Sequence, residues 1–301
     1  MYYLMGFKRN LRNVQLLSRA FFSGPSGQTD FGQLKRCYRN YLRVIQPDCT
    51  LSSRKKTELV SDTNQSKQLL NFYLNNTNDF DLRRLRRALE RPPVQLWRQR
   101  KIKILQNGLQ RMRRIDPDLA TLFNLVINKV FYYEFADCSG GSTPDAYGII
   151  YAIPKLSWGP EDVIEYYVHE LTHNLLYLDE ECHPHYRDYA ALNLKKNYAY
   201  STIRRVKRRL DQALHSLVVA TEILLLRKKK LGHFSARMVH PNSNMLIASC
   251  EATIKSIRSL QWRALLAPRG REILISCQKA NDFFRKKIKK NSLFLAGDRA
   301  Q

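Results

Sequence analysis

Acidic residues are scarce in this sequence: 26 aspartates and glutamates stand against 51 lysines and arginines, for a formal net charge of +25 at pH 7. Such an excess of positive charge attracts nucleic acid, anionic lipid or an acidic peptide. The basic runs lie on helix-like stretches and match no recognised nucleic-acid-binding module. We therefore expect an acidic peptide or protein as the partner, with nucleic acid as the alternative.

Closely spaced cysteines and long apolar runs are also missing. The six cysteines are scattered without a C-x-x-C pair, which excludes a zinc ribbon and offers no disulfide framework. The longest apolar run, 217–226, contains Glu222 and is too short to cross a bilayer. We expect a cytoplasmic protein without a transmembrane segment. The basic stretch 1–29 has no acid and gives the alternative of a mitochondrial-type targeting segment, although a basic amphipathic helix explains it as well.

Strand-like sequence is confined to the middle of the chain. The ranges 129–135 and 147–153 are rich in β-branched and aromatic residues and are separated by turn-forming residues. They predict a hairpin or a short sheet. Helical patterns fill the rest, so the predicted class is mainly α with a small β-sheet (α+β).

The predicted organisation has four parts. A chain of 301 residues that is 44% hydrophobic can bury a substantial core. The parts are a basic N-terminal segment (1–29), a helical N-terminal region (30–128), a metal-binding catalytic core (129–235) and C-terminal helices (236–301). Within the last two parts we expect long helices over about 201–230, 246–266 and 271–290.

An H-E-x-x-H motif is the most informative feature of the chain. It runs from His169 to His173 inside an apolar stripe of helical period, after a start signal at Gly159 and Pro160. Histidines four residues apart lie on one face of a helix and can bind one metal ion, while Glu170 can reach a water or substrate beside it. The motif therefore predicts a metal site on a buried helix.

Catalytic sites of this kind use three protein ligands. The helix expected next supplies His215 and Glu222, which are too far apart along its axis to bind the same ion. We place His215 first as the third ligand and keep Glu222 as the alternative. The pair His183 and His185 is expected in a solvated loop at the mouth of the site, with metal ligation as the less favoured reading.

Two families resemble this region. The five residues of the motif read as in thermolysin-like zinc peptidases. A longer similarity, over roughly 146–232, joins the motif to His183-Pro184-His185-Tyr186 and to the run around His215. It resembles the H-E-x-x-H peptide-modification proteins described as 2-oxoglutarate-dependent peptide β-hydroxylases. That resemblance implies Fe(II), 2-oxoglutarate as co-substrate, and His169, His173 and His215 as ligands beside Glu170.

Three functions follow as hypotheses. The first is a metal-dependent oxidoreductase, an Fe(II)- and 2-oxoglutarate-dependent dioxygenase that hydroxylates a ribosomally made peptide. The second is a zinc metallopeptidase with Glu170 as general base and Glu222 as third ligand. The third is a basic binding protein without catalytic activity. The sequence does not identify the residues that bind 2-oxoglutarate.

Overall fold

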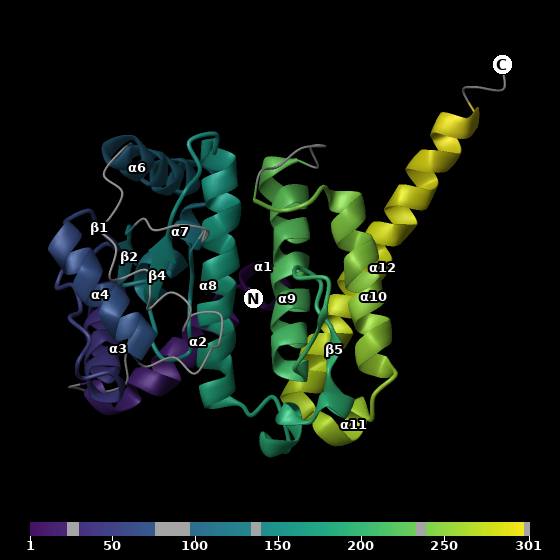
Figure 1. Cartoon of the computed structure of the whole chain (residues 1–301), viewed down its shortest axis with the longest axis horizontal. Helices are drawn as coiled ribbons and strands as arrows, with labels where there is room; N and C mark the ends of the chain where they lie inside the picture. The colour runs from purple at the N-terminus through teal and green to yellow at the C-terminus, as the bar shows by residue number, and fades with distance from the viewer. Residues whose placement is uncertain (23–29, 76–96, 134–139, 233–238, 298–301) are drawn as a thin grey trace. The chain divides into compact units, whose positions relative to one another are not determined.

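The computed structural model describes residues 1–22, 30–75, 97–133, 140–232 and 239–297 (Figure 1). Their architecture is mainly helical with one four-stranded and one two-stranded sheet, which confirms the predicted α+β class. The chain forms two compact units. The N-terminal unit comprises Leu4–Cys182 with Tyr2, and the C-terminal unit comprises His183–Gln301 with Met1 and Tyr3. This division falls inside the predicted core 129–235, and the four predicted ranges stay a prediction.

Helices make up most of the N-terminal unit. They are α1 (Tyr2–Met5), α2 (Phe7–Ser18), η1 (Arg19–Phe21), α3 (Phe31–Ile45), α4 (Thr63–Asn75), α6 (Arg98–Ile115), α7 (Pro117–Val126) and α8 (Pro160–Cys182). Local signals fix several of their ends. At the start of α7, for example, the Asp116 side chain accepts a 3.1 Å hydrogen bond from the Leu119 amide, with Pro117 at the first helical position.

The sheet of this unit contains β1 (Glu58–Val60), β2 (Lys129–Phe131), β3 (Gly140–Gly141) and β4 (Ile149–Ala152), in the order β1-β2-β4-β3. The first three in that order are parallel, and β3 is antiparallel to β4. In register, Val130 lies opposite Leu59 on one side and Ile150 on the other. Every residue of β2 and β4 is buried, as is usual in parallel sheets.

The short sheet expected over 129–135 and 147–153 is confirmed, and it is not a hairpin, because the strands β2 and β4 are parallel neighbours. The expectation that strands occur only in the middle of the chain was wrong, because strand β1 lies outside that range. With only three residues it shows no alternating pattern, and its extended form depends on pairing with residues some 70 positions away.

The closest helix packing in this unit joins α6 to α8. A Cβ atom at Gly108 of α6 would lie 2.2 Å from Cγ1 and 2.6 Å from Cβ of Val163 on α8. Glycine is therefore required for the two helices to approach as they do. This contact fixes α8, which carries the H-E-x-x-H motif, against the rest of its unit.

The C-terminal unit is also mainly helical. Its elements are η2 (Ala190–Asn193), η3 (Lys195–Asn197), β5 (Ala199–Tyr200), β6 (Lys207–Arg208), α9 (Leu210–Leu226), η4 (Arg227–Leu231), α10 (Ser243–Arg258), α11 (Trp262–Leu265) and α12 (Pro268–Gly297). The helix expected over 201–230 begins only at Leu210, because β5 and β6 form a hairpin whose turn includes Arg205 at φ 55°. Helix α9 is buried on nearly all sides.

Candidate metal centre

Helix α8 begins where the sequence predicts. Pro160 occupies its first turn, and the amide of Gly159 donates a 3.0 Å hydrogen bond to Oδ2 of Asp162. The acids Glu161 and Asp162 suit the positive end of the helix dipole. Because α8 starts at Pro160, the motif begins in the third turn of the helix, away from the ends, where helices fray.

Side-chain hydrogen bonds hold α8 against the rest of its unit, and three of them lie close to the motif. The Tyr166 hydroxyl donates to the carbonyl of Tyr151 on β4. The Tyr167 hydroxyl donates to the carbonyl of Leu105 on α6, at 3.1 Å. The Asn174 side chain accepts a 2.8 Å hydrogen bond from the amide of Gly148, just before β4. The helix is thus held on both sides of the motif, and the motif side chains start from a fixed backbone.

The two histidines of the motif point toward each other. Their Nε2 atoms lie 3.2 Å apart, and their ring centroids are 5.0 Å apart. Two nitrogen ligands about 2.0 to 2.1 Å from one zinc ion lie about 3.4 Å apart in tetrahedral geometry, and about 2.9 Å apart at a right angle. The observed separation falls between these values, so the distance between the two nitrogens is compatible with one transition-metal ion bound by His169 and His173.

Glu170 lies beside this pair in a buried position. Its side chain is 5% exposed, and Oε1 is 3.9 Å from Nε2 of His169. Oε2 accepts a 2.7 Å hydrogen bond from the hydroxyl of Ser142, which follows the edge strand β3. The hydroxyl fixes one carboxylate oxygen and leaves the other turned toward the imidazole pair. Sequence reasoning missed Ser142, because nothing in a turn 28 residues upstream indicates its contact with Glu170.

Aromatic side chains continue this face of α8. The ring of Tyr177 stacks on His173 with a centroid distance of 6.2 Å, and Tyr147 meets Tyr177 edge to face. The Tyr147 hydroxyl donates a 2.8 Å hydrogen bond to Glu181. Burial, with that hydrogen bond to Glu181, raises the pKa of Tyr147. The Tyr147 phenol therefore stays protonated at neutral pH and acts as a hydrogen-bond donor.

The two candidates for the third ligand both lie on α9, in the C-terminal unit, whereas the motif belongs to the N-terminal unit. The assignment of His215 or Glu222 to the motif's ion stays a prediction. Glu222 is fully buried and has other partners. Its Oε1 lies 3.0 Å from the α-amino group of Met1, and its Oε2 accepts a 2.9 Å hydrogen bond from the Tyr3 amide.

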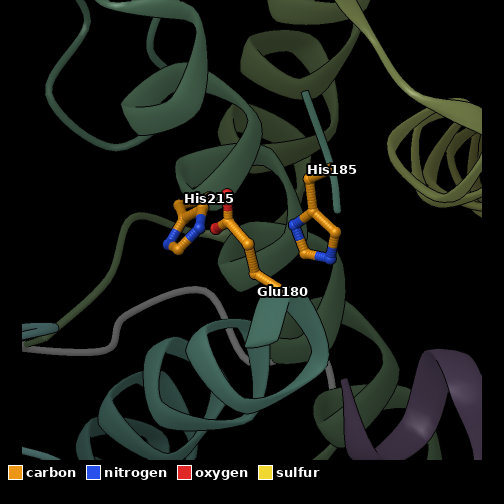
Figure 2. A group of neighbouring side chains, drawn as sticks. All are labelled: Glu180, His185 and His215. Atoms are coloured by element: carbon orange, nitrogen blue, oxygen red, sulfur yellow. The ribbon is translucent and has the colours of Figure 1, made fainter. Parts of the chain in front are cut away.

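A second group of potential ligands includes His215. His185 and His215 each offer one ring nitrogen, and these atoms lie within 4.8 Å of each other (Figure 2). Both residues belong to the C-terminal unit and are buried, with 0% and 7% exposure. These two imidazoles can contribute ligands to a metal ion.

The expectation that His185 lies in a solvated loop is therefore wrong. Its carbonyl accepts a 2.9 Å hydrogen bond from the amide of Ala267, and Tyr186 forms a β-bridge with Leu266. These contacts with residues about 80 positions later bury His185. No local pattern could reveal them. His183 is half-buried.

Comparison with models of known protein families and with curated proteins finds no match for this chain. Within the described ranges, none of the helices has the length and apolar character needed to span a membrane.

Proposed function

We propose that this protein is a metal-dependent enzyme whose ion is bound by His169 and His173 and whose substrate is a peptide. The observation that carries the proposal is the 3.2 Å separation of the two Nε2 atoms on a helix held rigid by its neighbours. Two neutral imidazoles at this distance can also form a hydrogen bond with each other, without a metal ion. The distance fits both arrangements, so metal binding is the property to test.

Each of the residues around the motif has a separate role in this proposal. His169 and His173 bind the ion through Nε2. Glu170, fixed by Ser142, accepts a hydrogen bond or a proton from a water molecule beside the ion. Tyr177 packs against His173 and limits the orientations of its ring.

An extended peptide suits the surroundings of the motif. Strand β3 pairs with β4 on one side, and within the described ranges no strand pairs with its other side. A peptide that added to this edge would run toward Ser142 and the carboxylate of Glu170. The positive charge of the chain favours an acidic peptide.

Our first candidate chemistry is hydroxylation with Fe(II) and 2-oxoglutarate. Its support is the sequence resemblance over roughly 146–232, which includes both motif histidines and His215. Bound iron would couple the oxidation of 2-oxoglutarate by O₂, giving succinate and CO₂, to the insertion of the second oxygen atom into a C–H bond of the peptide. The chain's contribution is to bind the ion, exclude bulk water around Glu170 and orient the peptide.

A zinc peptidase is the second candidate, and a specific observation favours it. Glu170 is buried, fixed through one oxygen and turned toward the imidazole pair through the other. This is the position required of a base that takes a proton from an attacking water. Zinc would supply the Lewis acid that lowers the pKa of that water.

Metal content and two assays test the proposal. Wild-type protein purified without added metal should contain Zn or Fe by elemental analysis, and His169→Ala and His173→Ala should each lose that ion. The iron-loaded protein is then incubated with 2-oxoglutarate and a library of Asp- and Glu-rich synthetic peptides, and succinate and a one-oxygen mass increase are measured. The zinc-loaded protein is incubated with the same library, and new peptide termini are measured.

Glu170→Gln separates the two chemistries. It keeps the shape of the side chain and removes the base. Hydrolysis should fall by roughly 10² to 10⁴, whereas iron-dependent succinate release should persist. His183→Ala, a substitution of a half-buried histidine outside the motif, is the matched control and should leave metal and turnover unchanged. A wild-type protein that binds neither ion would overturn the proposal.

A further inference from the structure

We infer that His185 and His215 of the C-terminal unit hold a metal ion, separate from the ion proposed for the H-E-x-x-H motif. This site shares no residue with His169, Glu170 and His173, and it does not depend on the proposed function. It also assigns to His215 a role different from the one that the sequence predicts, as third ligand of the motif's ion.

The first support is the pairing of two buried imidazoles. Histidine is only intermediate among residue types in how often it is fully buried, yet here two histidines, at 0% and 7% exposure, place ligand nitrogens within 4.8 Å of each other. Nitrogen ligands of one ion lie about 3 to 3.4 Å apart. A separation of at most 4.8 Å is therefore close to what a shared ion requires.

The second support is the rigidity of the backbone at both positions. The His185 carbonyl is bonded to the amide of Ala267 at 2.9 Å, and a Cβ atom at Gly270 would lie only 2.3 Å from that carbonyl. The chain at His185 is thus fitted closely against the start of α12. His215 is in the second turn of α9, where the next residue, Ser216, accepts a 2.8 Å hydrogen bond from the amide of Ile203. The backbone at both positions is thus held in place before any ion binds.

The chemistry of the donors points to the class of ion. Both donors that the C-terminal unit supplies are imidazole nitrogens (Figure 2). A pair of histidines suits Zn²⁺ or Fe²⁺ and is a poor match for Ca²⁺ or Mg²⁺, which prefer oxygen ligands. Two protein donors leave further coordination positions for water or a small ligand.

Zinc titration of the metal-free protein tests this inference. Wild-type protein is stripped with a chelator, titrated with Zn²⁺ and analysed for bound zinc after gel filtration. We expect two zinc ions per chain. His185→Ala and His215→Ala should each retain one ion, and His169→Ala should also retain one. The variant with both His169→Ala and His185→Ala should retain none.

Controls separate loss of a ligand from loss of the fold. His240→Ala removes a histidine that is equally buried, at 3% exposure, and lies outside both sets. It should retain two ions. Circular dichroism spectra of all variants should match that of the wild type. Should His185→Ala fail to fold, His215→Gln replaces the other imidazole with a polar side chain instead, and it should weaken the binding of the second ion at least tenfold.

The outcomes are distinct. One ion per chain that is lost on His169→Ala and on His215→Ala, but kept on His185→Ala, would overturn this inference and leave a single three-histidine centre. Two ions that both survive His185→Ala and His215→Ala would also overturn it. A wild-type protein that binds zinc at His185 and His215 but none at His169 and His173 would overturn the proposed function and leave the second site standing.

Discussion

The hydroxyl of Ser142 donates a 2.7 Å hydrogen bond to Oε2 of Glu170. This hydrogen bond joins Ser142, which follows the edge strand β3, to helix α8. It also fixes the carboxylate of Glu170 beside His169. A hydrogen bond to a charged group contributes about 1.5 to 3 kcal/mol. In the proposed function, the contact is thus strong enough to affect turnover.

Ser142→Ala should lower kcat about tenfold or more, since 1.4 kcal/mol corresponds to a factor of ten, and it should leave the bound metal in place. Ser142→Thr keeps the hydroxyl and should retain most of the activity. Steady-state kinetics with the peptide found in the assays above, together with metal analysis, measure both effects. Equal kcat for Ser142→Ala and wild type would show that the contact has no part in turnover.

The approach of α6 to α8 gives the second prediction. Gly108→Ala places a methyl group 2.2 Å from Cγ1 of Val163, so the helices must separate or Val163 must move. Overpacking of this kind costs about 1 to 3 kcal/mol of unfolding free energy. Denaturant unfolding should show this loss of stability. Metal titration should show weaker binding at His169 and His173.

Val163→Ala tests the cause of that loss. It removes the closest methyl group but keeps Cβ, which lies 2.6 Å from the introduced carbon. The double variant should therefore recover only part of the lost stability. A double-mutant cycle measures the coupling between the two positions. Strictly additive effects would mean that the clash is relieved elsewhere in the unit.

Local signals in the sequence account for much of this arrangement. The start of α8 at Pro160 and the common face of His169 and His173 follow from helix periodicity and from residues adjacent in the chain. The parallel pairing of β2 with β4 and the partner of Glu170 do not, because they depend on contacts between distant segments. The burial of His185 has the same origin: residues near Leu266 cover it.

The third prediction concerns pH. Burial, and then the charge of Arg39, lowers the pKa of Lys35 from 10.5 to about 8. Its ammonium group also donates a hydrogen bond to the carbonyl of Asn124. Between pH 8 and 10.5 the unfolded chain holds this proton more tightly than the folded protein does, so this residue's contribution to folding stability should rise with pH. Below pH 8 both states are charged and the burial penalty applies in full.

Lys35→Met isolates that effect from the titration of other groups. The difference in unfolding free energy between wild type and Lys35→Met should shift in favour of the wild type as pH rises from 7.5 to 9.5. The exposed Lys67 offers the matched control, and Lys67→Met should show a difference that is constant over the same range. Urea unfolding at four pH values is sufficient. A constant difference for Lys35→Met as well would mean that Lys35 does not change its charge in this range.

Thermal unfolding gives the fourth prediction, because an ion that binds only the folded chain must stabilise it. At a free zinc concentration 100 times the dissociation constant, one site contributes about 2.7 kcal/mol. For a chain of 301 residues that corresponds to a rise in Tm of roughly 4 °C per site. The metal-free wild type should show this rise when zinc is added, and chelator should reverse it.

The variant with both His169→Ala and His173→Ala should show a smaller rise, and His183→Ala should show the full one. An undiminished rise in the double variant would place the stabilising ion away from the motif. It would then be the C-terminal pair, His185 and His215, that ties metal binding to folding.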